Sequence, residues 1–517
     1  VLFRSVPLTE AQQSGKPVIT MKWIDRNKGD ATHPNYRSRL VCREIKRASN
    51  ADFIPDYASF SSMPPLESLK LLLSLMVTLR RSKSGNALKV RLLDISRAHF
   101  YGEAERDIFV QLPEGDRQEG FCGKLVKSMY GTRDASAIWQ RSYTELLIRA
   151  GFAKNQAWPS CFYHEGYGGI RVLVHGDDFV VLADDAGQKY LEDTLRSKYD
   201  LRVDGSIGPG ERHQQFAVLN RIVTYNEQEG SVSYEADPRH VDQMVRDLEM
   251  ENCKPVKTPS EKMSATEANL KLTTPTITPD RVSFFRSLVM RASYVAQDRP
   301  DIAEAVKCLS RRMHEPKESD FQDLKRLVRF LKGKPRVLLK FGRQKFADTI
   351  HMYVDSDFAG CLLTRRSTSG LVATFGRHTV KASSTLQSTI SLSSGEAEYY
   401  SIVRGVSIGM SLQEILRGWG LQPKLKVHTD SSAALGTCNR QGLGRSRHVQ
   451  TRFLWVQEKL ALHEFELVKI PTKQNVADLC TKGLPANEME RHMQSMGFEY
   501  SHGRAEAAKA WNERTSA

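Results

Sequence analysis

The chain has 517 residues, more than one hydrophobic core usually serves, so its length predicts about three or four domains. Its composition, 40% hydrophobic and 26% charged, is that of an ordinary folded protein, and its longest apolar run, 71–77, is too short to span a bilayer. The formal net charge of +15 indicates a polyanionic partner, unless it serves solubility alone.

The eight cysteines are scattered without a close pair, which excludes a zinc ribbon or knuckle and indicates reduced thiols. The chain does not begin with Met, and its first residues, VLFRS, resemble translated adapter sequence. We therefore treat residues 1–17 as a truncated, adapter-like start and leave VLFRS out of the expected fold. No signal peptide or membrane anchor is expected.

Short strands rich in basic residues follow from Val18 onward. Their cations are Lys22, Arg26, Lys28, Arg37, Arg39, Arg43, Lys46 and Arg47. A run of charges is usually a solvated face, but basic residues on a hairpin can also bind a triphosphate.

The next three elements are a helix, a strand and a helix. Pro64 and Pro65 open a leucine-rich helix, LESLKLLLSLMVTLR, and the strand ALKVRLLDIS carries Asp94 near its end. Apolar residues share one face between Ile138 and Ala150, which predicts an amphipathic helix there.

The stretch RVLVHGDDFVVLADD, 171–185, predicts a β-hairpin because two apolar runs flank a tight turn that contains Gly176. Asp177 and Asp178 lie at its tip, either as ordinary turn residues or as ligands of a divalent metal ion. A strand with an acid, a helix and an Asp-Asp hairpin follow one another in palm-type polymerases. This order leaves open whether the product strand is RNA or DNA.

From about Asp204 to Lys345 the composition turns basic and predicts helices with proline-marked breaks. Strands return near Ile350 and begin a final αβ unit, after which a polar tail, 486–517, is expected to fray. In this unit Asp355 and Asp357 share one strand face, so alternation cannot choose between them. Ser393 and Glu396 form a capping box at a helix start.

Many stretches, in one order, resemble the Pol polyprotein of copia-type LTR retrotransposons, reverse transcriptase followed by ribonuclease H. They include KWID, YRSRLVCREIK, LLDISRAHFYGEAERDIFVQLPEG, GKLVKSMYGTRDASAIW, HGDD, CKPVKTPSEK, LKRLVRFLKG, VDSDFAG, SSGEAEYY, HTDSSAAL and IPTKQNVADLCTKGL. Many matches in order are more specific than any single motif.

The resemblance implies an α+β fold: a right-hand polymerase followed by an αβ ribonuclease H-like domain. Its parts would be fingers and palm at 18–203, a thumb at 204–262, a connection at 263–346 and the ribonuclease H-like domain at 347–485.

By resemblance, Asp94, Asp177 and Asp178 hold two Mg²⁺ ions, which Mn²⁺ can replace, and Arg39, Lys22 and His99 contact the incoming dNTP; Arg26 and Lys28 are weaker candidates. Three features depart from the family pattern: His175 and Gly176 stand where Tyr-x usually precedes the acids, His99 stands where Phe is usual, and Asp134 stands where a glutamine is usual. None of these changes removes a metal ligand.

For the nuclease, the resemblance selects Asp355 over Asp357 and Glu398 over Glu396, and adds Asp430 and Asp478, again with two metal ions. His448 has no counterpart in the pattern and is expected to be a surface histidine. A replicase that makes RNA has no use for an enzyme that degrades RNA paired to DNA. The nuclease unit therefore predicts a DNA product and disfavours a viral RNA replicase.

The implied function is the copying of RNA, and then DNA, templates into DNA, with degradation of RNA in RNA/DNA hybrids. Its partners would be RNA template, DNA primer and product, hybrid, dNTPs and upstream Gag and Pol parts of the same element. The implied location is a cytoplasmic virus-like particle with nuclear access for integration. The alternative is a non-catalytic nucleic-acid-binding remnant, which retention of all seven metal carboxylates disfavours.

Overall fold

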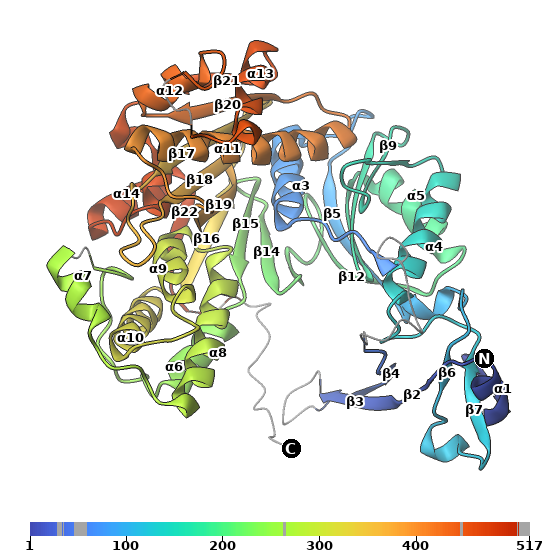
Figure 1. Ribbon diagram of the computed structural model, residues 1–517. Helices are drawn as coiled ribbons and strands as arrows, with labels where there is room; N and C mark the ends of the chain where they lie inside the picture. The colour runs from blue at the N-terminus through green and yellow to red at the C-terminus, as the bar shows by residue number, and fades with distance from the viewer. Residues whose placement is uncertain are drawn as a thin grey trace. The chain divides into compact units, whose positions relative to one another are not determined.

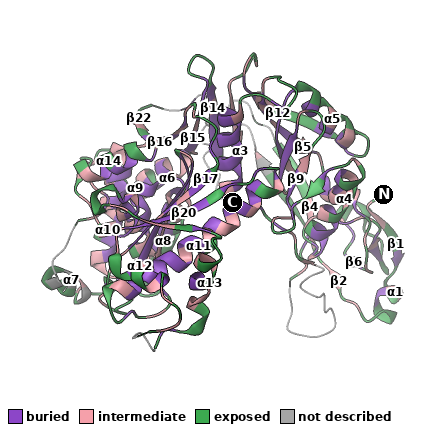
Figure 2. Ribbon diagram, turned by 90° about the horizontal axis from the view of Figure 1, so that it is seen from above, coloured by how far each residue is buried: buried purple, intermediate pink, exposed green. Residues whose placement is uncertain are grey.

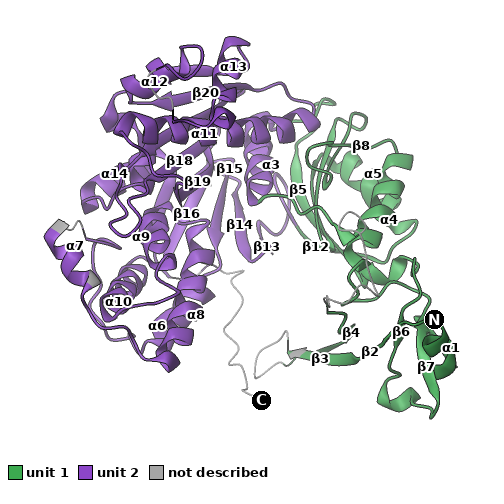
Figure 3. Ribbon diagram, in the orientation of Figure 1, with its two compact units in different colours: residues 1–65, 81–205, 509–517 green, residues 66–80, 206–508 purple. Residues whose placement is uncertain are grey.

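The computed structural model describes residues 1–27, 34, 36–45, 59–261, 265–444, 448–503 and 505, so the predicted phosphate contact Lys28 and the side chain of Arg26 lie outside it (Figure 1). The protein mixes helices and strands and divides into two compact units (Figure 3). Unit 1 holds residues 1–65 and 81–205, and unit 2 holds residues 66–80 and 206–508. Throughout these described stretches, every helix is too short or too polar to cross a membrane.

The first residues of unit 1 take part in the fold, contrary to the expectation that leaves VLFRS out of it. Strand β1 (Phe3–Pro7) pairs with β7 (Phe121–Leu125), and helix α1 (Leu8–Gln13) follows it. Buried Val6 packs in a small apolar cluster with Ala11, Phe109 and Cys122. Burial of these apolar side chains and pairing with β7 hold the first residues in the fold.

Two more strands of this small sheet and one separate hairpin complete this part of unit 1. Strands β2 (Val18–Ile19) and β6 (Phe109–Val110) join β1 and β7 in the order β1-β7-β6-β2. The predicted basic strands form a separate antiparallel hairpin, β3 (Met21–Asn27) with β4 (Tyr36–Cys42).

The main sheet of unit 1 has six strands in the order β12-β5-β11-β10-β9-β8. Their bounds are β5 (Lys89–Ile95), β8 (Ala153–Lys154), β9 (Cys161–His164), β10 (Ile170–His175), β11 (Asp178–Ala183) and β12 (Leu201–Ile207). The predicted hairpin is confirmed: β10 and β11 pair from Arg171 opposite Leu182 to His175 opposite Asp178. Gly176 has a φ of 66° in the turn, a conformation that glycine adopts without strain.

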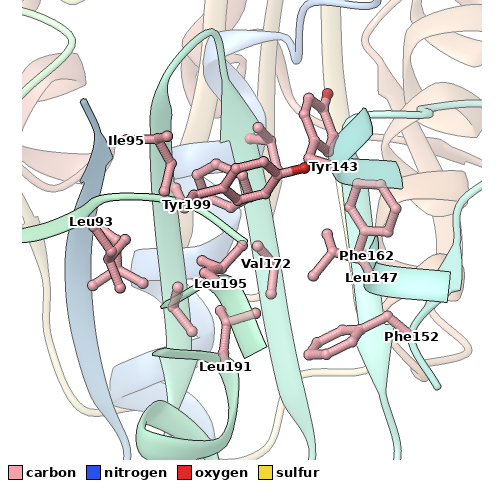
Figure 4. Close-up of a cluster of buried hydrophobic side chains, with 14 of the residues drawn as sticks. Leu93, Ile95, Tyr143, Leu147, Phe152, Phe162, Val172, Leu191, Leu195 and Tyr199 are labelled. Atoms are coloured by element: carbon pink, nitrogen blue, oxygen red, sulfur yellow. The ribbon is translucent and has the colours of Figure 1, made fainter. Parts of the chain in front are cut away.

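Helices α4 (Ala135–Arg149) and α5 (Asp185–Arg196) cover this sheet. The helix predicted at 138–150 thus begins three residues earlier. Apolar side chains of both helices and of the central strands form one buried cluster (Figure 4). The cluster includes Leu93, Tyr143, Leu147, Phe162, Val172, Leu191 and Leu195. It fixes the strand ends that carry the predicted acids.

Unit 2 contains the leucine-rich helix α3 (Leu66–Leu79), which lies in sequence inside the segment predicted as fingers and palm. Every residue from Ser68 to Thr78 is buried (Figure 2). The helix packs on β15, β16, β19 and α11 of the same unit. Apolar and small residues on all sides of a helix are typical of a core helix.

The first sheet of unit 2 has the order β13-β14-β15-β16-β22. Its strands are β13 (Gln215–Val218), β14 (Arg221–Asn226), β15 (Ser231–Ala236), β16 (Arg336–Phe341) and β22 (Phe498–Ser501). The prediction that 204–345 is helical is therefore wrong for 215–236, where β-branched and aromatic residues favour strands. The prediction of a fraying tail is also wrong up to Ser501, because α14 (Ala486–Ser495) leads into β22, which pairs with β16.

Helices do fill the middle of the segment predicted to be helical. They are α6 (Arg239–Asp247), α7 (Ala265–Leu272), α8 (Pro279–Ala296), α9 (Pro300–Ser310) and α10 (Glu318–Gly333).

The second sheet of unit 2 has the order β19-β18-β17-β20-β21, with β17 antiparallel to β18 and parallel to β20. Its strands are β17 (Thr349–Ser356), β18 (Thr368–Phe375), β19 (His378–Leu386), β20 (Lys424–Thr429) and β21 (Glu466–Lys469). Helices α11 (Ser394–Gly418), α12 (Ser432–Cys438) and α13 (Trp455–Ala461) complete the αβ unit. The predicted return to strands near Ile350 is confirmed.

Candidate metal centres

The predicted acids of unit 1 meet at one end of its main sheet. Asp94 on β5 lies opposite Asp178 on β11, and Asp177 occupies the hairpin turn. The carbonyl of Asp177 accepts a hydrogen bond of 3.1 Å from the backbone N–H of Ile95, and Trp139 Nε1 donates to the carbonyl of Gly176 at 2.7 Å. Helix α4 and strand β5 therefore hold the turn between them.

A cation that the sequence did not single out lies beside these acids. Arg202 on β12, the neighbour of β5, places Nη2 3.2 Å from Asp94 Oδ2 and also pairs with Asp204. Hydrogen bonding to Asp204, reinforced by the charges of Asp94 and Asp178, raises the pKa of Arg202. The adjacency of β12 and β5 is a tertiary feature, so no local pattern could have identified this contact.

His99, Tyr130 and Arg39 form a second group near the hairpin. The rings of His99 and Tyr130 are 4.5 Å apart, and the Arg39 guanidinium lies 5.5 Å from the Tyr130 ring. Burial lowers the pKa of His99, with the positive charge of Arg39 acting in the same direction and Asp177 opposing it. Lys22, the other predicted dNTP contact, is exposed on β3 opposite Val41.

His99 also lines a cavity of about 520 Å³ together with Gly176, Trp139 and Tyr143, and with the segment 59–63. The neighbouring Phe100 instead packs on the apolar cluster of Cys42, Ile108, Val110, Leu125 and Met129. The structure therefore turns the histidine toward the cavity and the phenylalanine toward the core.

Asp134, the acid found where a glutamine is usual, is buried and paired. Arg106 Nε lies 2.7 Å from Asp134 Oδ2, and Arg106 Nη2 lies 2.5 Å from Glu44 Oε2. Although burial works against it, hydrogen bonding to Glu44 and Asp134 raises the pKa of Arg106. The guanidinium thus compensates the acid that would otherwise repel a triphosphate.

The predicted acids of unit 2 come from three elements. Asp355 ends β17, Asp430 follows the parallel strand β20, and Glu398 lies in the second turn of α11. Tyr353 and His428 are in register, so the two aspartates that follow each by two residues meet at the carboxyl ends of their strands. Gly405 and Gly409 let α11 approach the sheet, since an added Cβ would lie 2.6 Å from Val354 and 2.5 Å from Leu425.

Ligand atoms of Asp355, Glu398 and Asp430 all lie within 4.8 Å of one another. Burial raises the pKa of Asp355 to about 6, and burial together with Asp355 and Asp430 raises the pKa of Glu398 to about 9. Glu398 Oε1 accepts from the N–H of Ser356 at 3.3 Å, whereas Oε2 is buried without a hydrogen-bond partner. Three oxygen donors and an orphaned carboxylate oxygen suit a hard divalent cation such as Mg²⁺.

The carboxylate of Asp478, the fourth predicted nuclease ligand, forms an ion pair with a lysine. Lys482 Nζ lies 2.8 Å from Asp478 Oδ1 and 3.4 Å from Asp355 Oδ2, and Thr481 Oγ1 donates to the same Asp355 oxygen. Lys482 belongs to no catalytic motif, although its position four residues after Asp478 in NVADLCTKGL favours such a pair on one helical face.

The near-duplicates of the two nuclease acids have structural partners. The carboxylate of Asp357 accepts from the backbone N–H of Thr368. Ser393 Oγ accepts from the N–H of Glu396 at 3.2 Å, as predicted for a helix start. Glu396 also accepts from Tyr400 Oη at 2.7 Å and contacts His448 Nε2 at 2.8 Å. His448 is exposed, as expected, and its ring is paired with this buried acid.

Known proteins are similar to this chain over most of its length. Residues 7–262 match the model of a family described as reverse transcriptase (RNA-dependent DNA polymerase). The chain is 27% identical over 503 residues to the Retrovirus-related Pol polyprotein from transposon TNT 1-94 of Nicotiana tabacum, with 94% of this chain and 36% of that protein covered. It is 26% identical over 497 residues to the corresponding polyprotein from transposon RE1 of Arabidopsis thaliana, with 93% and 32% covered.

The chain thus spans about a third of the length of these curated relatives. Among solved structures, a foamy viral protease-reverse transcriptase in complex with RNA/DNA hybrid matches with a TM-score of 0.48 and 11% identity, covering 88% of this chain and 50% of that chain. The same type of protein in complex with dsDNA matches with a TM-score of 0.49 and 12% identity, covering 90% and 81%.

Proposed function

Because residues 7–262 match the model of the reverse transcriptase family, we propose that the chain copies RNA and then DNA templates into DNA in unit 1. We further propose that unit 2 degrades the RNA strand of RNA/DNA hybrids. The observation that carries the second activity is the group of Asp355, Glu398 and Asp430, with its orphaned Glu398 oxygen, at adjacent strand ends.

In unit 1, Asp94, Asp177 and Asp178 would hold the divalent cations, and the turn contacts from Trp139 and Ile95 fix their positions. Such cations make a primer 3′-hydroxyl more acidic and neutralise charge that develops on the phosphate. Arg39 would bind the incoming triphosphate, since a guanidinium suits phosphate oxygens. Arg202 lies beside Asp94 and would compete with a bound cation for that carboxylate.

In unit 2, Asp355, Glu398 and Asp430 would hold a cation against the phosphate of the RNA strand. Two separate groups of carboxylates, one in each unit, give two separable activities. The presence of all seven predicted carboxylates supports an enzyme over a non-catalytic remnant.

Two matched variants test the proposal. Asp177→Asn should abolish dNTP incorporation on poly(rA)/oligo(dT) and leave hybrid cleavage intact. Glu398→Gln should abolish hybrid cleavage and leave incorporation intact. Loss of both activities in either variant, with the fold retained by circular dichroism, would refute the division of labour.

A further inference from the structure

Lys482 forms ion pairs with two of the four predicted acids of unit 2, Asp355 and Asp478. Its ammonium group bridges Asp478 Oδ1 at 2.8 Å and Asp355 Oδ2 at 3.4 Å. The Asp355 side chain is only 3% exposed, whereas that of Lys482 is 44% exposed. One end of this ion pair is therefore deep in the site, and the other can reach solvent.

The bridge divides the four predicted carboxylates into two sets. Asp355, Glu398 and Asp430 bring ligand atoms within 4.8 Å of one another. Asp478 belongs to the other set, because its carboxylate faces Lys482. A second cation shared by Asp355 and Asp478 would have to occupy the side of Asp355 where the ammonium lies. Two positive charges a few ångströms apart repel each other strongly in a partly buried site.

We propose that Lys482 is a positioning residue that takes the place of a second cation between Asp355 and Asp478. Without nucleic acid, the unit 2 site then binds one divalent cation, at Asp355, Glu398 and Asp430, and a second binds only by displacing the lysine. This inference rests on the proposed nuclease function, because it concerns the cations of that site.

The backbone around Lys482 allows such a displacement. The N–H of Lys482 donates to the carbonyl of Asp478 at 3.1 Å, and Thr481 is tied to Asp355. The main chain is thus held without the ammonium group. A lysine side chain has four rotatable carbons and can swing to solvent while Asp478 stays in place.

The test counts Mn²⁺ ions on the full chain by electron paramagnetic resonance, in an Asp94→Asn, Asp177→Asn background that weakens binding in unit 1. The parent should bind one Mn²⁺ tightly in unit 2. Lys482→Gln should bind a second ion, with a dissociation constant at least about tenfold lower than the parent's second ion, because one opposing charge is gone. Lys482→Arg should behave as the parent, since it keeps the charge.

The matched control is Lys424→Gln, which removes another lysine of unit 2 that pairs with an aspartate, Asp348 at 3.5 Å. It should leave the Mn²⁺ count and affinities unchanged. Equal binding by the parent and Lys482→Gln, or two equally tight ions in the parent, would overturn the inference.

Failure of this inference is distinguishable from failure of the proposed function. If Glu398→Gln abolishes hybrid cleavage but Lys482→Gln binds Mn²⁺ as the parent does, the nuclease stands and the role of Lys482 falls. If the unmodified chain cleaves no hybrid, the nuclease function falls whatever the Mn²⁺ count.

Discussion

His99 is one of the residues at which unit 1 differs from the copia-type pattern. Its ring lines the cavity beside Gly176, and burial lowers its pKa, which favours the neutral form of the ring. A flat ring beneath the sugar of a bound nucleotide would exclude a 2′-hydroxyl by shape, and imidazole is smaller than phenyl. We therefore expect measurable ribonucleotide incorporation, reduced by His99→Phe and increased by His99→Ala.

Primer extension with dNTP and rNTP in parallel measures this discrimination. Phe100→Ala is the control, because Phe100 packs on an apolar cluster and its loss should lower stability rather than discrimination. Discrimination lost in Phe100→Ala alone would show that the phenylalanine, and not the histidine, selects the sugar.

Glu396 and Glu398 are two residues apart on α11 but have different surroundings. Glu396 accepts from the N–H of Leu392 at 3.0 Å and contacts Tyr400 and His448, whereas Glu398 faces Asp355 and Asp430. Glu396→Gln should therefore keep hybrid cleavage and lower the unfolding free energy by about 1 kcal/mol, as loss of a helix-start contact does. Urea unfolding and a cleavage assay on the same sample check both parts. Cleavage lost as completely as in Glu398→Gln would reverse the assignment.

At the scale of elements, α3 is joined to β19 through a buried histidine. His378 Nε2 donates to the carbonyl of Gly342 at 2.7 Å, so Nδ1 accepts from Ser74 Oγ at 2.8 Å. Burial lowers the pKa of His378 to about 4, against about 6.5 in an unfolded chain. The folded state thus favours the neutral ring, so its contribution is complete above pH 6.5 and is lost as the pH falls toward 4.

This shift predicts that unit 2 loses up to about 3 kcal/mol of unfolding free energy between pH 6.5 and 4 through His378 alone. His378→Gln removes the titration, so its stability should fall less over the same range. Urea midpoints of both proteins at pH 7.5 and 4.5 give the comparison. The same drop in both proteins would show that His378 does not carry this pH dependence.

Local sequence was sufficient for elements whose partners are close in the chain. The hairpin β10–β11 was predicted because its two apolar runs and its turn are contiguous. Strand β22 was missed because its partner β16 is more than 150 residues away, and four residues of mixed polarity carry no signal of their own. The strands at 215–236 were missed for a different reason. The basic composition of 204–345 favours helices, whereas the β-branched and aromatic residues of these short stretches favour strands.

The same limit applies to the candidate sites. The acids were found because each lies in a distinctive short motif. Arg202 and Lys482 were not singled out, because their contacts with Asp94 and Asp355 depend on how strands and turns are brought together. The compensation of Asp134 by Arg106, 28 residues earlier, likewise required the fold.

At the scale of the whole molecule, the net charge is +15, but some of the cations form ion pairs inside the fold. Arg221, Arg299 and Arg336 are paired with Asp298, Asp301 and Glu235 inside unit 2. Each of these cations is neutralised by its own buried acid. Exposed cations of the β3–β4 hairpin, such as Lys22 and Arg37, are available to a polyanion.

If these exposed cations contact a nucleic-acid duplex, its affinity must fall steeply with salt, because each contacted phosphate releases counterions. We expect the logarithm of the affinity for an RNA/DNA hybrid to fall linearly with the logarithm of KCl concentration, by about 0.9 per contacted phosphate. Fluorescence anisotropy of a labelled hybrid measures this slope.

Lys22→Gln and Arg37→Gln should each reduce the slope by about one. Lys189→Gln is the control, since Lys189 is neutralised by Asp193 at 2.9 Å on α5 and should leave the slope unchanged. A slope near zero in the unmodified chain would mean that the net charge serves solubility alone.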